Sequence, residues 1–543
     1  MSKIVSAEKA VELIRDGETV AIGGIGGNGV TEEIFLALEK RFLETGHPRD
    51  LMLFTPGGPG DGRGKGLDHM AHPGFLKGVI STYVGPLAPK LAGMIEREEL
   101  EGYILPLGPL TQLYREIASG RPGLVTHVGL HTFVDPRVEG PPQNAISQRE
   151  LVEVVQLGGR EWLFYKAFPI HVAIIRGTTA DEQGNISLEK EIGLFDMFQA
   201  AQAARCSGGR VIAQVERVTT AKSLRPKDVR IPGVLVDAVV VARPENHMQT
   251  LKVQYNPAYS GEIRVPSQML SSLVVDYGRM GHISRSQKRE FTQSRADTRR
   301  VIARRAVLEL SPDGVANVGV GAPELVADIV MTEGIGDRIS FTVEHGPIGG
   351  IPAYGLNFGA ALNPDMLVEM PSLLDFYDGG GIDVAFLGLI EADRLGNVNA
   401  SRSGESRTAG GFIDISQNAK KLIFCCNFTR GSEVEVSGGK AQVIREGGSK
   451  FVSQVRQITF NGPFAAQREQ FVLFVTERAV FRLTREGLML IEIAPGIDLR
   501  RDILDRMEFA PIIVPELKEM PREIFDLSGR MGLREAFEGK GRG

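Results

Sequence analysis

The chain has 543 residues, too many for one hydrophobic core, so two large domains are the expected organisation. Hydrophobic residues make up 42% of the sequence and charged residues 24%, which is typical of a globular protein with a full core in each domain. The net charge is only −5, and acidic and basic residues are interspersed along the chain. This pattern argues against a nucleic-acid partner and against binding to a membrane surface.

The N-terminal residues 1–18 lack the apolar stretch and cleavage site of a secretory signal, and no apolar run has the length of a membrane helix. The cysteines Cys206, Cys425 and Cys426 suit neither a disulfide framework nor a C-x-x-C metal site. The histidines show no metal-ligand spacing with cysteine or acidic partners. We therefore expect a cytoplasmic protein without a bound metal.

Along the chain, short runs rich in valine and isoleucine alternate with segments of helical periodicity. Strand-like runs occupy residues 18–24, 51–58, 171–177 and 236–242. Residues 31–44, between the first two runs, have apolar side chains three and four positions apart, which predicts a helix. This alternation predicts α/β domains with mostly parallel sheets.

The order of these segments repeats in the second half of the chain. The matching pairs are 20–32 with 316–324, 51–60 with 339–346, 179–186 with 391–398, and 209–212 with 420–423. Four weak matches in the same order indicate a duplicated α/β domain. We predict domains at residues 1–290 and 291–543, divided near the arginine-rich stretch 284–300.

The two copies differ at the end of their second strand. The first copy has Pro56-Gly57-Gly58, whereas the second has Val343-Glu344-His345. The carboxyl end of a parallel strand lies at the edge where open α/β sheets bind ligands. Because only one copy carries a glutamate there, we expect one reactive carboxylate per chain.

Residues 24–29 read G-x-G-x-x-G between a predicted strand and a predicted helix, as in a dinucleotide-binding fingerprint. That fingerprint also needs an acidic residue at the carboxyl end of the next strand, but Asp50 precedes the strand at 51–54. A tight glycine turn is therefore favoured over NAD binding, and a ligand could still approach its backbone. The sequence has no Walker A, H-E-x-x-H or G-x-S-x-G motif.

Residues 344–350 resemble the E-x-G-x-x-G-G glutamate motif of family I coenzyme A transferases. Other segments that are similar to this family are 132–136, 176–185, 255–262, 317–323, 409–421, 475–484 and 492–498. The resemblance extends from about residue 10 to about residue 515 and is strongest to single-chain propionate and acetate CoA-transferases. It implies two tandem, similar open α/β domains, an N-terminal α-type domain and a C-terminal β-type domain that carries the catalytic glutamate.

The resemblance also implies a ping-pong reaction through Glu344. This carboxylate would attack an acyl-CoA to give a mixed anhydride and CoA thiolate, and the thiolate would then form a glutamyl-CoA thioester. A second carboxylic acid would reverse these steps and leave as its CoA thioester. Coenzyme A is then a substrate and covalent intermediate, with no permanently bound cofactor. Such relatives act in short-chain fatty acid metabolism and are usually homo-oligomers, dimers or tetramers.

Two glycine segments match ligand-binding segments of this family. Gly410 and Gly411 match the segment that lines the oxyanion and CoA site, and Gly319-Val320-Gly321 matches the CoA-contacting loop. Glycine suits both places because a side chain would keep backbone N–H donors away from the ligand.

Two positions depart from the family and are candidates for the substrate pocket, together with Gly26 and Gly27. Leu107 stands where many members have glutamine, and His131 stands where many have glycine. We interpret Leu107 as favouring a larger or more apolar acyl group than acetate or propionate. His345 is interpreted as structural, because adjacent residues on a strand point to opposite faces.

Two other functions remain open from the sequence. Water could intercept the glutamyl thioester, which would make the protein an acyl-CoA hydrolase on the same scaffold. The protein could also be a non-catalytic sensor that binds acyl-CoA or a sugar phosphate, although a glutamate in only one repeat argues against this.

Overall fold

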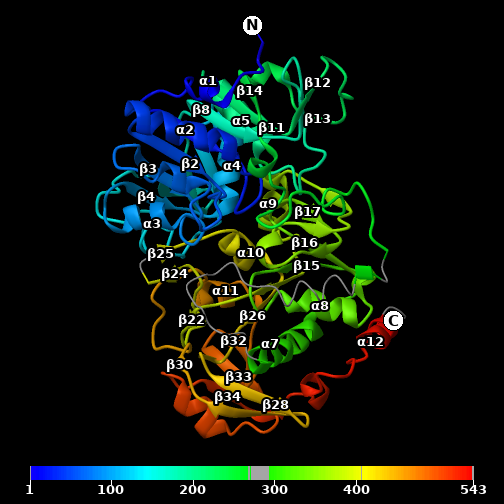
Figure 1. The fold of residues 1–543 in the computed structure, drawn as a ribbon. Coiled ribbons are helices and arrows are strands. Elements are labelled where there is room, and N and C mark those ends of the chain that lie inside the picture. Colours follow the sequence, from blue (N-terminus) through cyan, green and yellow to red (C-terminus); the bar gives the residue numbers. More distant parts are fainter. Residues whose placement is uncertain (1, 267–268, 271–292, 405, 541–543) are drawn as a thin grey trace. The chain divides into compact units, whose positions relative to one another are not determined.

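The computed structural model describes residues 2–266, 269–270, 293–404 and 406–540 (Figure 1). The chain forms two compact units, each assembled from segments that are distant in sequence. The first unit comprises Met1–Val265, Val343–Asp375 and Ser403–Asp414, and the second comprises Pro266–Thr342, Phe376–Arg402 and Ile415–Gly543. The predicted boundary between residues 290 and 291 lies outside the described residues.

The first unit is built on a seven-stranded sheet in which every pair of neighbours is parallel. In spatial order the strands are β14 (Ala238–Val241), β11 (Arg210–Val215), β8 (Val172–Arg176), β1 (Thr19–Ile22), β2 (Leu51–Thr55), β3 (Leu76–Ser81) and β4 (Glu101–Ile104). All residues of β2 and β8 are buried, because helices and loops cover both faces of the sheet. This explains why these strands read as continuous apolar runs.

Strand β1 lies at the point where the order of the sheet reverses. The chain places β2, β3 and β4 on one side of β1, and β8, β11 and β14 on the other. The loops that follow β1 and β8 therefore diverge at the carboxyl edge of the sheet. In open α/β sheets this switch point is where ligands bind.

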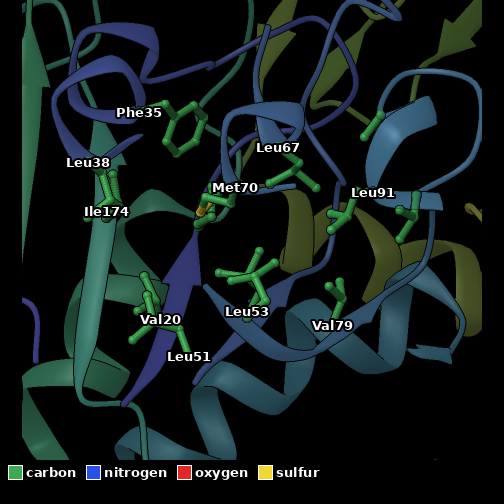
Figure 2. Close-up of a cluster of buried hydrophobic side chains, with 14 of the residues drawn as sticks. Val20, Phe35, Leu38, Leu51, Leu53, Leu67, Met70, Val79, Leu91 and Ile174 are labelled. Atoms are coloured by element: carbon green, nitrogen blue, oxygen red, sulfur yellow. The ribbon is translucent and has the colours of Figure 1, made fainter. Parts of the chain in front are cut away.

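Side chains from the central strands and from α2 form the core of the first unit (Figure 2). Val20, Leu53 and Val79 project from neighbouring strands, and Phe35 and Leu38 project from α2; all five are fully buried. Each such side chain stabilises the fold by about 1.5–3 kcal/mol relative to leaving it exposed.

The first unit contains five helices that precede the second half of the chain. They are α1 (Ala7–Val11), α2 (Glu32–Thr45), α3 (Pro89–Glu96), α4 (Leu107–Ala118) and α5 (Met197–Cys206). Helix α2 ends at Gly46, whose φ of 71° gives the left-handed conformation that glycine adopts without strain. The predicted helix at 31–44 is thus confirmed to within one residue at each end.

Smaller strand groups complete the first unit. They are β5 (Gly123–Thr126), β6 (Val152–Leu157) and β7 (Arg160–Lys166); β9 (Thr179–Asp181), β10 (Ile186–Ser187), β12 (Arg217–Thr219) and β13 (Val229–Ile231); β17 (Pro347–Ile348) with β20 (Met366–Leu367); and β18 (Ile351–Pro352) with β19 (Ala361–Leu362). The last two pairs belong to the segment that contains Glu344.

The second unit has its own larger sheet, which is parallel in its first part. The strands that the second unit contributes to this sheet lie in the order β16 (Ile339–Thr342), β15 (Gly314–Val318), β21 (Val384–Leu387), β26 (Lys421–Cys425), β31 (Phe471–Val475), β32 (Ala479–Thr484), β33 (Gly487–Ile493) and β34 (Ile512–Glu519). Pairing is parallel from β16 to β31 and antiparallel from β31 to β33. The predicted fold class, α/β with mostly parallel sheets, is confirmed in both units.

The remaining helices and short strands come from residues 293–540; some belong to the second unit alone, and others include residues of the first unit. The helices are α7 (Gln293–Ala306), α8 (Leu325–Thr332), α9 (Met370–Asp378), α10 (Phe412–Asn418), α11 (Gly462–Gln467) and α12 (Leu533–Lys540). The strand pairs are β22 (Glu391–Ala392) with β23 (Val398–Asn399), β24 (Arg402–Ser403) with β25 (Ser406–Arg407), β27 (Thr429–Arg430) with β30 (Gly448–Ser449), and β28 (Glu433–Ser437) with β29 (Lys440–Arg445). Within the described ranges no helix is both long enough and apolar enough to cross a membrane.

Candidate active site

The loops that follow β1, β2 and β3 contact one another at the carboxyl edge of the first sheet. The N–H of Gly26, after β1, donates to the carbonyl of Gly57, after β2, at 2.9 Å. A side chain at Gly58 would overlap the carbonyl oxygen of Tyr83, which follows β3. The three loops therefore form one continuous rim, and its glycines are required because backbones approach each other there.

Glu344 lies in a tight turn two residues after β16. The N–H of Gly346 donates to the carbonyl of Val343 at 2.9 Å, and the N–H of Val343 donates to the carbonyl of Pro347 at 3.0 Å. Within this turn Val343 and His345 are buried, whereas Glu344 is half-buried. The turn thus anchors its apolar and aromatic neighbours and leaves the carboxylate partly accessible.

His345 fixes this turn against the loop that follows β1. Its ring packs edge-on against Phe358, with centroids 5.4 Å apart, and its Nε2 lies 4.0 Å from the position of a Cβ at Gly26. A Cβ at Gly359 would lie 2.5 Å from His345 Cδ2, and one at Gly193 would overlap the His345 carbonyl oxygen. Glycines thus shape the slot that holds His345, which supports its structural role.

Burial lowers the pKa of His345 to about 3, so its imidazole is neutral at physiological pH. A neutral neighbour does not form an ion pair with the Glu344 carboxylate. The nucleophilic character of this carboxylate is therefore not reduced by a cation at position 345.

Gly26 lies next to this turn and Gly27 follows it in the same loop, and their place in the substrate pocket stays a prediction. Asn28, which the sequence analysis did not single out, is buried and donates from Nδ2 to the carbonyl of Phe358 at 2.9 Å. A side chain at position 27 would overlap Leu251, so packing also requires glycine at this position.

A second group of predicted residues meets at the start of α4. The N–H of Leu107 donates to the carbonyl of Gly410 at 3.0 Å, and the hydroxyl of Thr82 donates to the same oxygen at 3.1 Å. The N–H of Gly108 donates to the Asp414 carboxylate at 3.0 Å, where the helix N-terminus favours negative charge. The segment 408–414 is therefore held on the loops that follow β3 and β4.

Gly410 itself has a φ of 57° and no atom within 4 Å of a Cβ position. Glycine is favoured here by its backbone conformation, and the open space would admit a ligand. The Leu107 side chain is fully buried, and its place in the substrate pocket stays a prediction.

His131 also has a left-handed backbone, with a φ of 61°. Its N–H donates to the Asp135 carboxylate at 3.0 Å, and Arg137 donates to both oxygens of that carboxylate at 3.0 and 2.8 Å. The positive φ gives a physical reason why glycine would suit this position. The place of His131 in the substrate pocket stays a prediction.

The other predicted CoA-contacting residues lie in the second unit, in the loop after β15. The N–H of Gly319 donates to the carbonyl of Phe386 at 2.8 Å, and Gly321 has a φ of 105°. Val320, between them, is 51% exposed, which is unusual for an apolar side chain at a strand end. Burial raises the pKa of the adjacent Glu324 to about 7, although a bond from the Gly321 N–H opposes the shift.

One buried carboxyl group at the switch point carried no signal in the sequence. Asp196 is fully buried, and its Oδ1 accepts the N–H of Gly24 at 3.2 Å. Burial raises the pKa of Asp196 to about 7. Only the packing of the segment before α5 against the β1 loop brings these residues together. No cluster of three histidine, cysteine or acidic residues suited to a metal occurs in the part of the chain that the structure describes.

Comparison with known proteins identifies relatives along nearly the whole chain. The family model for coenzyme A transferase matches residues 4–242. Caffeate CoA-transferase of Acetobacterium woodii is 43% identical, over 97% of this chain and 98% of its own. Acetate CoA-transferase YdiF of Escherichia coli O157:H7 is 38% identical, over 96% of this chain and 95% of its own. The crystal structure of the E. coli O157:H7 acyl-CoA transferase YdiF as a thioester complex with CoA matches with a TM-score of 0.87 and 36% identity, covering 98% of this chain and 97% of the other.

Proposed function

The chain belongs to the coenzyme A transferases, as a single-chain enzyme of family I, and from this premise we propose that Glu344 is its covalent nucleophile. The enzyme transfers CoA from an acyl-CoA to a free carboxylic acid. The observation that carries the proposal is the half-buried Glu344 in a turn anchored by buried His345 at the carboxyl edge of the first sheet. The CoA thioester in the YdiF crystal structure supports a covalent intermediate.

In the first half-reaction, a carboxylate oxygen of Glu344 bonds to the acyl carbonyl carbon and the carbon–sulfur bond breaks, releasing CoA thiolate. The thiolate then bonds to the glutamyl carbonyl carbon, and the substrate acyl group leaves as a carboxylate. The second acid reverses both steps, so no net proton transfer is needed. Partial burial favours this attack because it reduces the hydration of the carboxylate.

Each addition creates an oxyanion, for which Gly410 and Gly411 are the proposed backbone donors. The N–H of Gly410 already donates to the carbonyl of Thr82, at 3.3 Å. This contact favours the N–H of Gly411 as the oxyanion donor, with Gly410 supplying the turn that presents it.

The test is mass spectrometry of the protein after incubation with acyl-CoA, with borohydride reduction to locate the adduct. We expect a CoA adduct on Glu344 in the wild type and none in Glu344→Gln, whose turnover should fall by roughly 10³-fold or more. Asp365→Asn is the matched control, because Asp365 lies in the same segment with an exposed carboxylate paired to Arg264. An adduct on another residue, or full activity of Glu344→Gln, would refute the proposal.

The same preparation separates the alternative functions. Loss of the adduct only when a carboxylic acid is added indicates transfer, whereas its spontaneous loss to water indicates a hydrolase. Tight acyl-CoA binding without any adduct would indicate a sensor.

For the substrate, we propose an acyl group larger and more apolar than acetyl, of the arylpropenoyl class. Leu107 supports this, since it replaces a polar glutamine at the start of α4, next to Gly410. The relative named for caffeate is also more similar than the one named for acetate, 43% against 38% identity. We expect kcat/KM to be at least about 10-fold higher for cinnamoyl-CoA than for acetyl-CoA. In Leu107→Gln, the difference in kcat/KM between these two substrates should be smaller. A preference for acetyl-CoA or butyryl-CoA would instead favour short-chain fatty acid metabolism.

We further propose that the enzyme works in the cytoplasm as a homo-oligomer, a dimer or tetramer. The free Cys206, Cys425 and Cys426 suit a reducing compartment. Light scattering of the purified protein would give the oligomeric state, and a monomer at assay concentration would contradict this part of the proposal.

A further inference from the structure

Two histidines and two glutamates of the first unit form a continuous chain of hydrogen bonds between α2 and residues 69–72, in and just after the 3₁₀ turn η1 (Leu67–Met70). His69 Nε2 lies 2.9 Å from a Glu32 oxygen, and His69 Nδ1 lies 2.5 Å from a Glu39 oxygen. The other Glu39 oxygen lies 2.8 Å from His72 Nε2. Glu32 and His69 are both buried, whereas His72 is about one-third exposed.

The geometry specifies the charge of His69. A neutral imidazole has one N–H and one lone pair, so it cannot donate to two carboxylates at once. Only the imidazolium satisfies both Glu32 and Glu39. Burial alone would lower the pKa of His69, but the bonds to Glu32 and Glu39 raise it above its ordinary value.

The same Glu32 carboxylate also holds the loop that follows β2. Its second oxygen accepts the N–H of Gly66 at 3.0 Å. Gly66 forms a backbone bridge with Gly60, and the N–H of Gly60 donates to the carbonyl of Gly26 at 3.0 Å. A series of direct contacts therefore leads from His69 through Glu32 to Gly26, which lies beside the Glu344 turn.

We propose that His69 is a positioning residue for the transfer reaction: as an imidazolium it fixes Glu32, and thereby clamps residues 57–66 against the Gly26 loop beside Glu344. This inference rests on the proposed function. It assigns His69 no contact with substrate, and its effect is on the alignment of the acyl group with Glu344.

Other charged groups also face this cluster. From η1 itself, Asp68 is buried and accepts the N–H groups of Lys90 and Leu91 at the start of α3, at 3.0 and 3.2 Å. Burial raises the pKa of Asp68, while Lys90 lowers it. Asp68 and Lys90 do not bond to His69, so its two partners remain Glu32 and Glu39 among the described contacts.

The proposal predicts a specific alkaline limb in the pH profile. When pH rises above the raised pKa of His69, the ring loses a proton and one carboxylate then faces a lone pair. The clamp on residues 57–66 loosens, and kcat falls while KM for acyl-CoA changes little. Misalignment of about 1 Å can reduce rate by roughly 10²-fold, so we expect a 10- to 100-fold fall in kcat.

The experiment compares the wild type with His69→Gln and with His72→Gln as the matched control, across pH 6 to 9.5. His72→Gln also removes an imidazole from Glu39 but leaves both bonds of His69 intact. We expect His69→Gln to have a low kcat at every pH and to lack the alkaline limb that His69 causes. The pH profile of kcat for His72→Gln should match that of the wild type. At residues 57–66 and 24–29, amide hydrogen exchange should be faster in His69→Gln than in the wild type. In the wild type itself, exchange at these residues should become faster only when the pH rises above the pKa of His69.

If His69→Gln does not fold, Glu39→Gln provides the second test. It removes one of the two carboxylates and should move the alkaline limb to lower pH. The proposal would be overturned if His69→Gln had the hydrogen-exchange rates and the pH profile of the wild type. It would also be overturned if the alkaline limb of Glu39→Gln lay at the same pH as that of the wild type. The CoA adduct on Glu344 distinguishes failure of this inference from failure of the proposed function. If only the clamp is lost, the adduct still forms, although slowly.

Discussion

Asp196 illustrates how a single buried group can control stability through pH. Its pKa is raised to about 7 from an ordinary value of 3.8 because burial disfavours the charged form. Between these two pH values the folded protein binds one more proton than the unfolded chain at this position. The contribution of Asp196 to stability is therefore fully present below pH 4 and is lost as pH rises toward 7.

We predict that Asp196→Asn increases the free energy of unfolding at pH 8, by up to about 4 kcal/mol for a three-unit shift. Asparagine keeps an oxygen that accepts the Gly24 N–H but carries no charge. The gain should shrink toward pH 4, as measured by urea unfolding at a series of pH values. Asp365→Asn, with an exposed carboxylate, serves as the control and should show no such trend. A gain independent of pH would contradict the assignment of the buried charge.

The sequence predicts the roles of individual residues that belong to a motif or that distinguish one repeat from the other. Glu344 stood out by its motif and by the departure of one repeat from the other, and in the structure Gly26 lies beside its turn. Asn28 and Asp196 could not be predicted, because their burial depends on packing against segments about 170 or more positions away. For His131, the positive φ adds a backbone reason why glycine would suit this position.

At the scale of elements, α4 depends on a carboxylate from a distant segment for its first turn. Asp414 accepts the N–H of Gly108, and the neighbouring N–H of Leu107 holds Gly410. A carboxylate at this position satisfies an otherwise unpaired N–H group and interacts favourably with the helix dipole.

We predict that Asp414→Ala lowers the free energy of unfolding by about 1–3 kcal/mol and also lowers kcat. The reason for the second effect is that Gly410 and Gly411 lose a fixed attachment to α4. Ser6→Ala is a suitable control, because it removes the N-cap of α1 far from these glycines in sequence. It should lower stability, measured by denaturant unfolding, but leave kcat unchanged. Equal kcat in both variants would contradict a role for α4 in the site.

The repeated strand–turn–helix shows what periodicity can and cannot predict. Both copies form as expected, β1 followed by α2 and β15 followed by α8. The glutamates that end the two paired segments, Glu32 and Glu324, nevertheless lie in different surroundings. Glu32 is bonded to His69 and Gly66, whereas burial raises the pKa of Glu324 to about 7. Local pattern specifies the element, but the partners of its charged groups come from loops elsewhere in the chain.

At the scale of the whole molecule, the α/β class and parallel sheets follow from the alternation of apolar runs with helical segments. The assignment of segments to compact units does not follow from it. Residues 343–375 and 403–414 belong to the first unit, although they come from the second half of the sequence. Their packing, such as Phe358 on Asn28, relies on complementary shape and backbone contacts that leave no periodic signal.

The proposed division at residues 290 and 291 can be tested with two separate chains. We predict that residues 1–290 alone are inactive and melt at a lower temperature than the intact protein, because the segments around Glu344 and Gly410 are missing. Co-expression with residues 291–543 should restore CoA transfer, since each unit then regains all of its segments. The measurements are thermal melting and transferase activity; an active fragment 1–290 would contradict the role of Glu344.

The first unit is made of three separate chain segments, and their order along the chain determines when the unit can be completed during synthesis. The ribosome has finished its first part at Val265, but Asp414 emerges only after a further stretch that belongs largely to the second unit. At roughly 5 to 20 residues per second, this interval lasts roughly 7 to 30 seconds. In the first part of this interval, before His345 itself is made, the slot shaped by Gly26 and Gly193 has no occupant. We therefore expect nascent chains of this enzyme to complete their first unit only after Asp414 has emerged from the ribosome.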